Sequence, residues 1–577
     1  MYLRANPRSG HDYWMVARAH RTGDTTREER CLYLGRLDTL EPPLIEQRRQ
    51  QVRALGDPTL SFAFDALLVK LGHPAPLPSL RDVDFTTVRS YGPELAFVRL
   101  AEGLEVAKLI NDDSPKGGGP PLGEMVIALA TYVNQHPGSY RRFVGWYRRS
   151  ALPIFLHLSP EQVTYSATLN ALSYLQPGRT RPWESTIYHR VLKSFHYRCE
   201  RVDIDSTVKE LDGRLCRILA KFGRAKTGTI SKRRQIMITF LVDQRGSLLG
   251  HEVFPGNTND MKTLAPVDRR LRQDYGEAVA KAPRVVDRGY TSLKNVNGLV
   301  RRKEPFLVAV RAKPGSKELP FLQELGPHEG WPEIEERVRA ASLERKGVKW
   351  VVTWNDEVAG RNGDGRRDHM EKAKEAFSKL ARAIEAGRVR SRSERDRKVG
   401  AILVRYGMRR FLRVQGERKG LGFRVEETGV RAEKEEGADG YQVYATTERW
   451  LTEKDVVKFY RRRDRIEKAI RTMSSCLGLG SVHVATPEHV RGHFFVHALG
   501  YQLRNAGQLT LEEKGETMSI DEALWELEQL HVVELTVKGS EVGIHRKLTT
   551  MDGTVTGLVQ VFSLTERGQF PGVEGGI

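Results

Sequence analysis

Alternating apolar and polar positions in the middle of the chain predict a run of β-strands. A stretch at 201–205 alternates up to an acid, and 235–242 is a long apolar stretch bounded by a turn. The pattern then alternates between helical and strand periods. The expected strands are 201–205, 235–242, 248–254, 284–287 and 306–310, and the expected helices are 261–275 and 293–302. This order predicts the α/β class with a mixed sheet flanked by helices, inside a multidomain chain that is α+β overall.

The periods on either side of this stretch predict further segments. Strand-like runs at 13–17 and 31–34 indicate an N-terminal β-hairpin, and helical spacing dominates from 60 to 195. A β-rich insertion is expected with strands at 350–354, 400–406, 411–414 and 441–444, a charged helix at 368–386 and a solvated turn at 388–398. The segments expected are 1–58 (small β unit), 59–197 (helical, DNA-binding), 198–311 and 451–510 (two parts of the core), 312–450 (insertion) and 511–577 (helical or irregular).

The charge of the chain indicates a polyanionic partner. The 577 residues carry 93 Lys and Arg against 73 Asp and Glu, a formal net charge of +20, which favours nucleic acid over a small neutral ligand. Four cysteines without a CxxC spacing favour neither a zinc knuckle nor a disulfide framework, and fit a reducing cytoplasm. The longest apolar stretch, 494–503, is too short to span a bilayer, so no membrane partner is expected.

Two carboxylates follow short apolar strands and form the first candidate for chemistry. Asp205 follows Ile204, and Asp287 follows Val286. Ligand sites of open α/β sheets form at strand ends, and two nearby acids repel each other unless a cation neutralises them. Mg²⁺ or Mn²⁺ suits such oxygen ligands. The alternative is that both acids are ordinary surface or turn residues.

A charged segment near residue 460 supplies a third acid. Its composition predicts one helix on which Tyr460, Arg463, Glu467, Arg471 and Ser474 share a face. A carboxylate between arginines on one face can serve a metal ion and a phosphate together. The alternative is a surface helix with an internal Glu–Arg pair.

Several short motifs then occur in a fixed order with characteristic spacing. They are Asp205-Ser206-Thr207, Ser231-Lys232, Gly256-Asn257-Thr258-Asn259-Asp260, Asp287-Arg288-Gly289-Tyr290, a Y-x2-R-x3-E signature at Tyr460, Arg463 and Glu467, and the stretch from His483 through 491–503. With these motifs the chain resembles the insertion-sequence DDE transposases, whose RNase H-like core is split by a β-rich insertion. The resemblance covers about residues 13–533.

The resemblance implies a function and roles for individual residues. Asp205, Asp287 and Glu467 would be the catalytic acids and the ligands of two Mg²⁺ or Mn²⁺ ions. The DNA-contacting residues would be Tyr460, Arg463, Arg471, Lys468 and Arg288. The partners would be double-stranded DNA, as terminal inverted repeats and target, and a second copy of the chain in the DNA complex. Location in a prokaryotic cytoplasm, on the nucleoid when DNA is bound, follows from the same resemblance.

Two positions depart from the pattern of that family. A lysine is common seven residues after the glutamate, where this chain has Ser474, and a tryptophan is common after the signature arginine, where it has Asp464. Arg471 or Lys468 is expected to take over the phosphate contact. The alternatives to a transposase are an RNase H-like nuclease without strand transfer and a decayed, non-catalytic DNA-binding relative.

Basic and aromatic residues outside the core suggest where DNA recognition lies. Arg141-Arg142 and Arg148-Arg149 flank Trp146-Tyr147 in the helical region, as phosphate contacts would require. A solvated face on a packing domain explains the same pattern. One aromatic residue of the insertion, Trp354 or Trp450, is a candidate for stacking on a displaced base.

Overall fold

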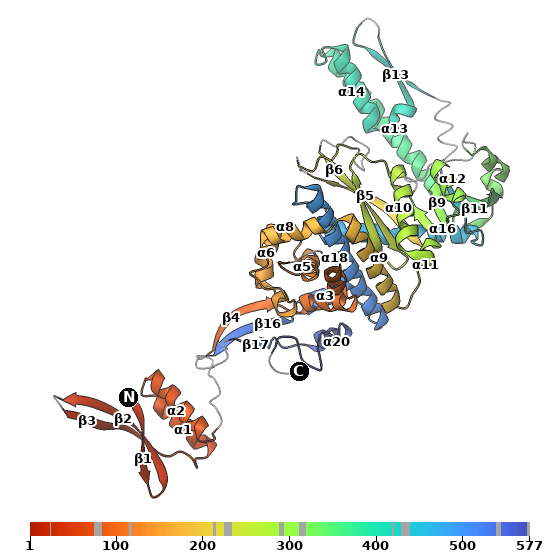
Figure 1. The fold of residues 1–577 in the computed structure, drawn as a ribbon. Helices are drawn as coiled ribbons and strands as arrows, with labels where there is room; N and C mark the ends of the chain where they lie inside the picture. The colour runs from red at the N-terminus through yellow and green to blue at the C-terminus, as the bar shows by residue number, and fades with distance from the viewer. Residues whose placement is uncertain are drawn as a thin grey trace. The chain divides into compact units, whose positions relative to one another are not determined.

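The computed structural model describes residues 1–22, 25–73, 83–114, 118–211, 215–223, 233–287, 293–310, 319–417, 420–428, 439–537 and 544–573. Two compact units make up the chain (Figure 1). The first comprises Met1–Gly92, Leu527–Thr556 and Thr565–Ile577, and the second comprises Pro93–Glu526 and Gly557–Leu564. Among the described residues, no helix is both long and apolar enough to cross a membrane.

The first unit contains two small antiparallel sheets. One has the order β1-β2-β3, and its apolar side packs with helices α1 and α2 around Val16, Leu34 and Phe64. The other has the order β17-β16-β4 and joins strands more than 400 residues apart. The elements are β1 (Tyr2–Arg8), β2 (His11–Thr22), β3 (Thr25–Arg36), α1 (Pro42–Arg53), α2 (Pro58–Lys70), β4 (Val83–Ser90), β16 (His531–Val537) and β17 (His545–Leu548).

A nine-stranded sheet forms the centre of the second unit. Its order is β10-β11-β12-β15-β9-β8-β5-β6-β7, with parallel pairing at β5–β8 and β8–β9 and antiparallel pairing elsewhere. The strands are β5 (Val202–Glu210), β6 (Gln235–Asp243), β7 (Leu248–Pro255), β8 (Arg284–Val286), β9 (Phe306–Val310), β10 (Glu333–Glu335), β11 (Val338–Arg345), β12 (Val348–Asn355) and β15 (Tyr441–Thr446). The predicted α/β class with a mixed sheet and an N-terminal antiparallel hairpin is confirmed.

Helices cover both faces of this sheet (Figure 1). Before the sheet come α3 (Gly92–Gly103), α4 (Val106–Asp112), α5 (Leu122–Gln135), α6 (Tyr140–Arg149), α7 (Leu152–Phe155), α8 (Tyr165–Tyr174) and α9 (Pro177–Ser194). Within and after it come α10 (Asp260–Asp274), α11 (Gly276–Ala280), α12 (Leu293–Arg301), α16 (Glu453–Arg461), α17 (Asp464–Ser475), α18 (Pro487–Glu513), α19 (Ile520–Leu527) and α20 (Gly553–Val561). Short 3₁₀ turns lie at Pro320–Leu325, His328–Gly330 and Met408–Arg410.

The helical region before the sheet shares one apolar core with it. Leu129 of α5, Leu172 of α8 and Phe494 of α18 belong to the same buried cluster as Ile238 and Phe240 of β6. Gly492 of α18 lies so close to the backbone of α8 that a Cβ there would meet the Leu172 carbonyl oxygen at 2.4 Å. The region from α3 to α9 is therefore part of the body that holds the sheet.

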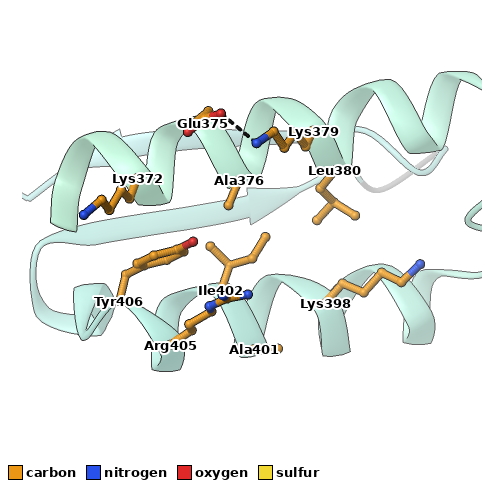
Figure 2. A pocket seen from close by; sticks show the side chains of 10 residues that line it. All are labelled: Lys372, Glu375, Ala376, Lys379, Leu380, Lys398, Ala401, Ile402, Arg405 and Tyr406. Atoms are coloured by element: carbon orange, nitrogen blue, oxygen red, sulfur yellow. Dashed lines mark ion pairs between the residues drawn. The ribbon is translucent and has the colours of Figure 1, made fainter. Parts of the chain in front are cut away.

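The insertion carries an arm with its own small core. Helices α13 (Asp356–Glu385) and α14 (Arg392–Arg405) pack with the hairpin of β13 (Leu412–Gly416) and β14 (Phe423–Glu427). A groove of about 570 Å³ lies between the two helices, with Ile402 and Leu380 in its lining and Lys372, Lys398 and Arg405 around it (Figure 2).

Three expectations about local structure are wrong. The strand expected at 400–406 and the second part of the turn expected at 388–398 are replaced by α14, which begins at Arg392, because Ser391 caps its first turn and Glu394 pairs with Lys398 one turn later. The helical region contains the strand β4, and the C-terminal region contains β16 and β17. Pairing between β4 and β16 stabilises these strands across the length of the chain, which a local period does not reveal.

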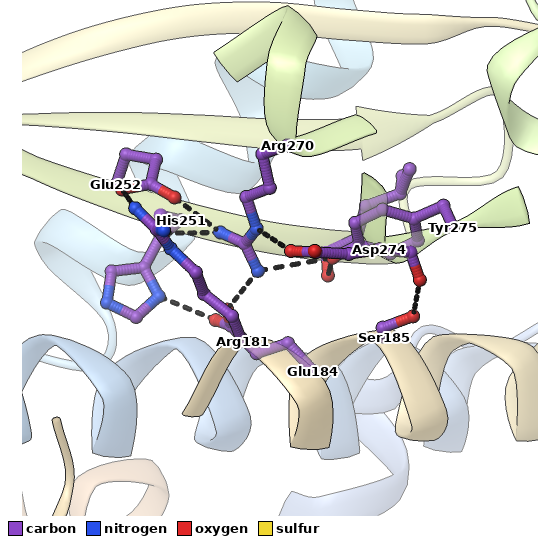
Figure 3. A network of polar contacts seen from close by, with 9 residues as sticks. Arg181, Glu184, Ser185, His251, Glu252, Arg270, Asp274 and Tyr275 are labelled. Atoms are coloured by element: carbon purple, nitrogen blue, oxygen red, sulfur yellow. Dashed lines mark hydrogen bonds and ion pairs between the residues drawn. The ribbon is translucent and has the colours of Figure 1, made fainter. Parts of the chain in front are cut away.

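A buried ionic network joins the helical region to the sheet (Figure 3). The Arg270 guanidinium of α10 donates to Glu184 of α9 at 2.6 Å and to the backbone oxygen of His251 in β7 at 2.7 Å. The His251 ring contacts Glu184 at 2.6 Å, and Arg270 also pairs with Glu252. Burial alone would raise the pKa of Glu184, but the charges of His251 and Arg270 hold it below its usual value.

We predict that Arg270→Met lowers the free energy of unfolding by about 3–5 kcal/mol, because it leaves buried carboxylates without a partner. Arg269→Met on the same helix is the control: Arg269 is exposed, and its loss should cost less than about 0.5 kcal/mol. Urea titration of both variants measures the difference. Equal losses in the two variants would contradict the role given to the network.

Candidate active site

Parallel strands place Asp205 and Asp287 beside each other. Ile204 of β5 pairs with Val286 of β8, so the next residue of each strand lies at the same level of the sheet. The expectation that the strand ends at Asp205 is wrong, because β5 continues to Glu210 through antiparallel pairing with β6. Asp205 therefore sits where the neighbouring β8 ends, and its carboxylate accepts a hydrogen bond from the Ser206 backbone at 2.8 Å.

A single guanidinium contacts both acids. Arg463 Nη1 donates to Asp287 Oδ1 at 3.0 Å, and Nη2 lies 3.9 Å from Asp205 Oδ2. Tyr460 donates its hydroxyl to the same Asp287 oxygen at 3.1 Å and accepts from Arg463 at 3.2 Å. Since Arg463 is 6% exposed while Asp287 is half exposed, a buried cation faces two carboxylates that solvent can reach.

The protonation states follow from this arrangement. Burial, together with the negative Asp287, raises the pKa of Tyr460 to about 12, although Arg463 opposes the shift. Burial would lower the pKa of Arg463, but Tyr460 and the acids facing it raise it above its usual value. At neutral pH Tyr460 is therefore a hydroxyl donor and Arg463 a full positive charge.

A second ion pair lies behind the acids on the same side of β5. The Arg201 guanidinium binds the carboxylate of Asp203 and the backbone oxygen of Phe459, and it stacks over the Phe459 ring at 4.7 Å. Burial raises the pKa of Asp203 to about 6, although the Arg201 charge opposes the shift. This pair ties the first strand of the core to the end of α16.

The expected single helix from Tyr460 to Ser474 is wrong. Helix α16 ends at Arg461 and α17 begins at Asp464, with Arg463 as the N-terminal cap residue of α17. At this break the Arg463 side chain points at Asp205 and Asp287. Tyr460 and Arg463 therefore do not share one continuous helical face with Glu467.

Glu467 lies in the first turn of α17 and is exposed. Its backbone N–H bonds to the Arg463 carbonyl at 3.4 Å, so Glu467 lies one helical turn after the residue that contacts both aspartates. Over the described part of the chain, no three or more His, Cys, Asp or Glu side chains are grouped to hold a metal ion. The two aspartates nevertheless offer accessible, hard oxygen ligands of the kind that Mg²⁺ takes.

Ser474, which lies seven residues after Glu467, contacts a cation of another element. Ser474 Oγ accepts a hydrogen bond of 2.6 Å from Lys209 Nζ of β5, while Arg471 and Lys468 are exposed on α17. Arg288 lies outside the described residues, as does Ser231-Lys232. Sequence reasoning missed Lys209 and Asp203, which a period-two reading of β5 would have found: residues 203, 205, 207 and 209 are all polar within a buried strand.

The basic and aromatic residues proposed to contact DNA outside the core belong to other elements than the acids. The arginines of α6 at 141, 142, 148 and 149 are exposed, whereas Tyr140, Phe143 and Tyr147 on its other side are buried. Trp354 stacks on His328 with ring centroids 4.0 Å apart, and Trp450 is 75% exposed. Of the two tryptophans, Trp450 is the one whose ring is accessible to a base.

A similarity to known proteins covers the part of the chain that contains this site. A family model described as the transposase DDE domain matches residues 199–503, more than half of the chain. The matched range begins just before β5 and ends within α18, so it contains both aspartates, Arg463 and Glu467. No curated protein matches the chain. With β5, β8 and α17 arranged in this way and the match extending over them, the chain belongs to the family of transposases with a DDE domain.

Proposed function

We propose that this transposase cleaves DNA at the ends of an insertion sequence and joins the freed 3′-hydroxyls to target DNA, using two divalent metal ions. The observation that carries the proposal is the guanidinium of Arg463, which contacts Asp205 and Asp287 from neighbouring parallel strands. Two acids held together at one level of a sheet form the start of a divalent cation site, and the family match supplies the reaction class.

Asp205, Asp287 and Glu467 would hold the ions. Bound Mg²⁺ or Mn²⁺ would activate the attacking oxygen and neutralise the leaving oxygen of the scissile phosphodiester. The chain's own residues prepare the site: Arg463 balances the charge of the two aspartates, and Tyr460 orients Asp287 through its hydroxyl. Because the Tyr460 hydroxyl stays protonated, Tyr460 acts as a donor rather than as a nucleophile.

Double-stranded DNA, as terminal repeats and as target, is the proposed partner, and the net charge of +20 supports this class of ligand. A homodimer is proposed for the DNA complex, since two element ends require two catalytic sites. Location with the nucleoid in the cytoplasm of a prokaryote is part of the same proposal.

The first test replaces each acid by its amide. Asp205→Asn, Asp287→Asn and Glu467→Gln should each lower cleavage of terminal DNA by about 10³-fold or more, since each loses a ligand to cations that contribute several kcal/mol. Asp464→Asn, an exposed acid of the same helix, is the control and should cleave normally. Normal cleavage by any of the three amide variants would refute the assignment of that acid.

The same assay separates the transposase from its alternatives. A nuclease would cleave terminal DNA in Mg²⁺ or Mn²⁺ but leave the freed ends unjoined to target DNA. A non-catalytic relative would bind the DNA and cleave it with neither ion. Either result would overturn the proposed strand transfer.

A second test concerns the arginines of α17. Arg471→Ala should leave the melting temperature unchanged and lower cleavage by roughly 10- to 100-fold, the loss of about 1.5–3 kcal/mol expected for one charged hydrogen bond to phosphate. Arg463→Ala should lower both cleavage and stability, because Asp205 and Asp287 lose their shared counter-charge. Exposed Arg465→Ala is the control. Full cleavage by Arg471→Ala would show that Arg471 does not replace the missing lysine.

A third test addresses DNA recognition by α6. Deleting the helical region would expose the core it shares with the sheet, so substitution is the informative change. Replacing the four exposed arginines of α6 by Gln should weaken binding to the element ends. The dependence of binding on salt should fall by about 0.9 in log–log slope for each phosphate that the variant no longer neutralises. An unchanged slope in a folded variant would assign α6 to packing alone.

A further inference from the structure

Positively charged side chains also lie near the end of β5, beyond Asp205. On the side of β5 that faces α17, Asp203 and Asp205 are followed by Thr207 and then Lys209. The Lys209 ammonium is held by Ser474 Oγ at 2.6 Å, and its side chain passes Gly480, where a Cβ would lie 3.7 Å from Lys209 Cδ. Four residues of strand separate Lys209 from Asp205 by about 13 Å.

The segment 215–223 is fixed against the same end of the sheet. Lys221 exchanges two backbone hydrogen bonds with Gln235, of 3.1 and 2.8 Å, and Gln235 pairs with Glu210 of β5. Cys216, Leu219 and Ala220 are buried in the core of the unit and anchor the segment. Lys209 and Lys221 therefore sit at one sheet end, on the two sides of the first residue of β6.

The outer side of this segment combines exposed apolar side chains with cations. Leu215, Ile218 and Phe222 are 71%, 67% and 57% exposed, and the guanidinium of Arg234 lies 5.6 Å from the centre of the Phe222 ring. In sequence, residues 214–242 contain eight Lys and Arg and no Asp or Glu. Glu210 of β5 pairs with Arg233 at this end of the sheet, so cations are in excess here. Apolar side chains among an excess of cations fit a polyanion with apolar surface, which is the chemistry of DNA bases and sugars behind their phosphates.

We propose that Lys209, Lys221 and Arg234, with Ile218 and Phe222, form a DNA-contact surface on which the duplex beyond the cleaved bond lies. The proposal rests on the proposed function, which places the cleaved bond at Asp205. A path of about 13 Å from there spans roughly four phosphates of one strand at 3.4 Å each. Lys209 and Lys221 contact phosphates, and Phe222 and Ile218 pack on the sugar and base surface between them.

The test measures binding of the full chain to a 30-base-pair duplex of arbitrary sequence by fluorescence anisotropy in EDTA, over a range of salt concentrations. Lys209→Met and Lys221→Gln should each weaken binding and reduce the log–log salt slope by about 0.9, because each leaves one phosphate without its cation. Phe222→Ala should weaken binding at every salt concentration with the slope unchanged. Lys281→Gln, a 76% exposed lysine near the start of β8 at the opposite end of the sheet, is the matched control.

Two further variants keep the outcomes distinct. Lys209→Arg should restore the wild-type slope, which a purely structural role for Lys209 would not require. Asp205→Asn should abolish cleavage with binding intact, so that cleavage surviving this change refutes the proposed function without touching the binding result. Slopes and affinities equal to those of Lys281→Gln would overturn the surface. So would a change of oligomeric state in Phe222→Ala with unaltered DNA affinity, since the apolar patch would then be a protein contact.

Discussion

The repulsion between two carboxylates is the constraint around which the core is arranged. Asp205 and Asp287 lie at the same level of the sheet because their strands pair in parallel up to the residues before them. Two neighbouring negative charges repel each other unless a cation lies close to both, and the Arg463 guanidinium is such a cation. Arg463 lies at the break between α16 and α17, where the backbone changes direction. The interruption of the helix therefore accompanies the contact between its guanidinium and the two acids.

This arrangement needs a rigid support, because the contacts of Arg463 tolerate little movement. Support comes from one apolar core that joins the helical region, α17, α18 and β6. The buried network around Arg270 adds polar contacts between α9, α10 and β7. Removing one partner of such a network is costly, because it leaves a buried charge unpaired. The helical region therefore supports the position of the acids indirectly, through the core that it shares with α17 and β6.

Much of the sheet could be predicted from the sequence because its strands are apolar and bounded by turns. The run at 235–242 corresponds to β6, and Asp287 follows β8 as expected, whereas Asp205 lies within β5. The prediction was wrong at α14 because Ile402, Leu403 and Val404 resemble a strand locally, whereas the cap at Ser391 favours a helix. It also missed β4, whose partner β16 lies more than 400 residues away, and the hairpin of β16 and β17.

Side-chain interactions between elements were beyond the reach of the sequence for a different reason. The helical period places Tyr460, Arg463 and Glu467 on one face, but it does not reveal the ion pairs that Arg463 makes at the break between α16 and α17. Ser474 shows the same limit: α17 by itself has no cation at this position, and β5 places the ammonium of Lys209 against it. The cation beside Ser474 belongs to a strand and not to α17, so the sequence of the α17 motif alone does not reveal it.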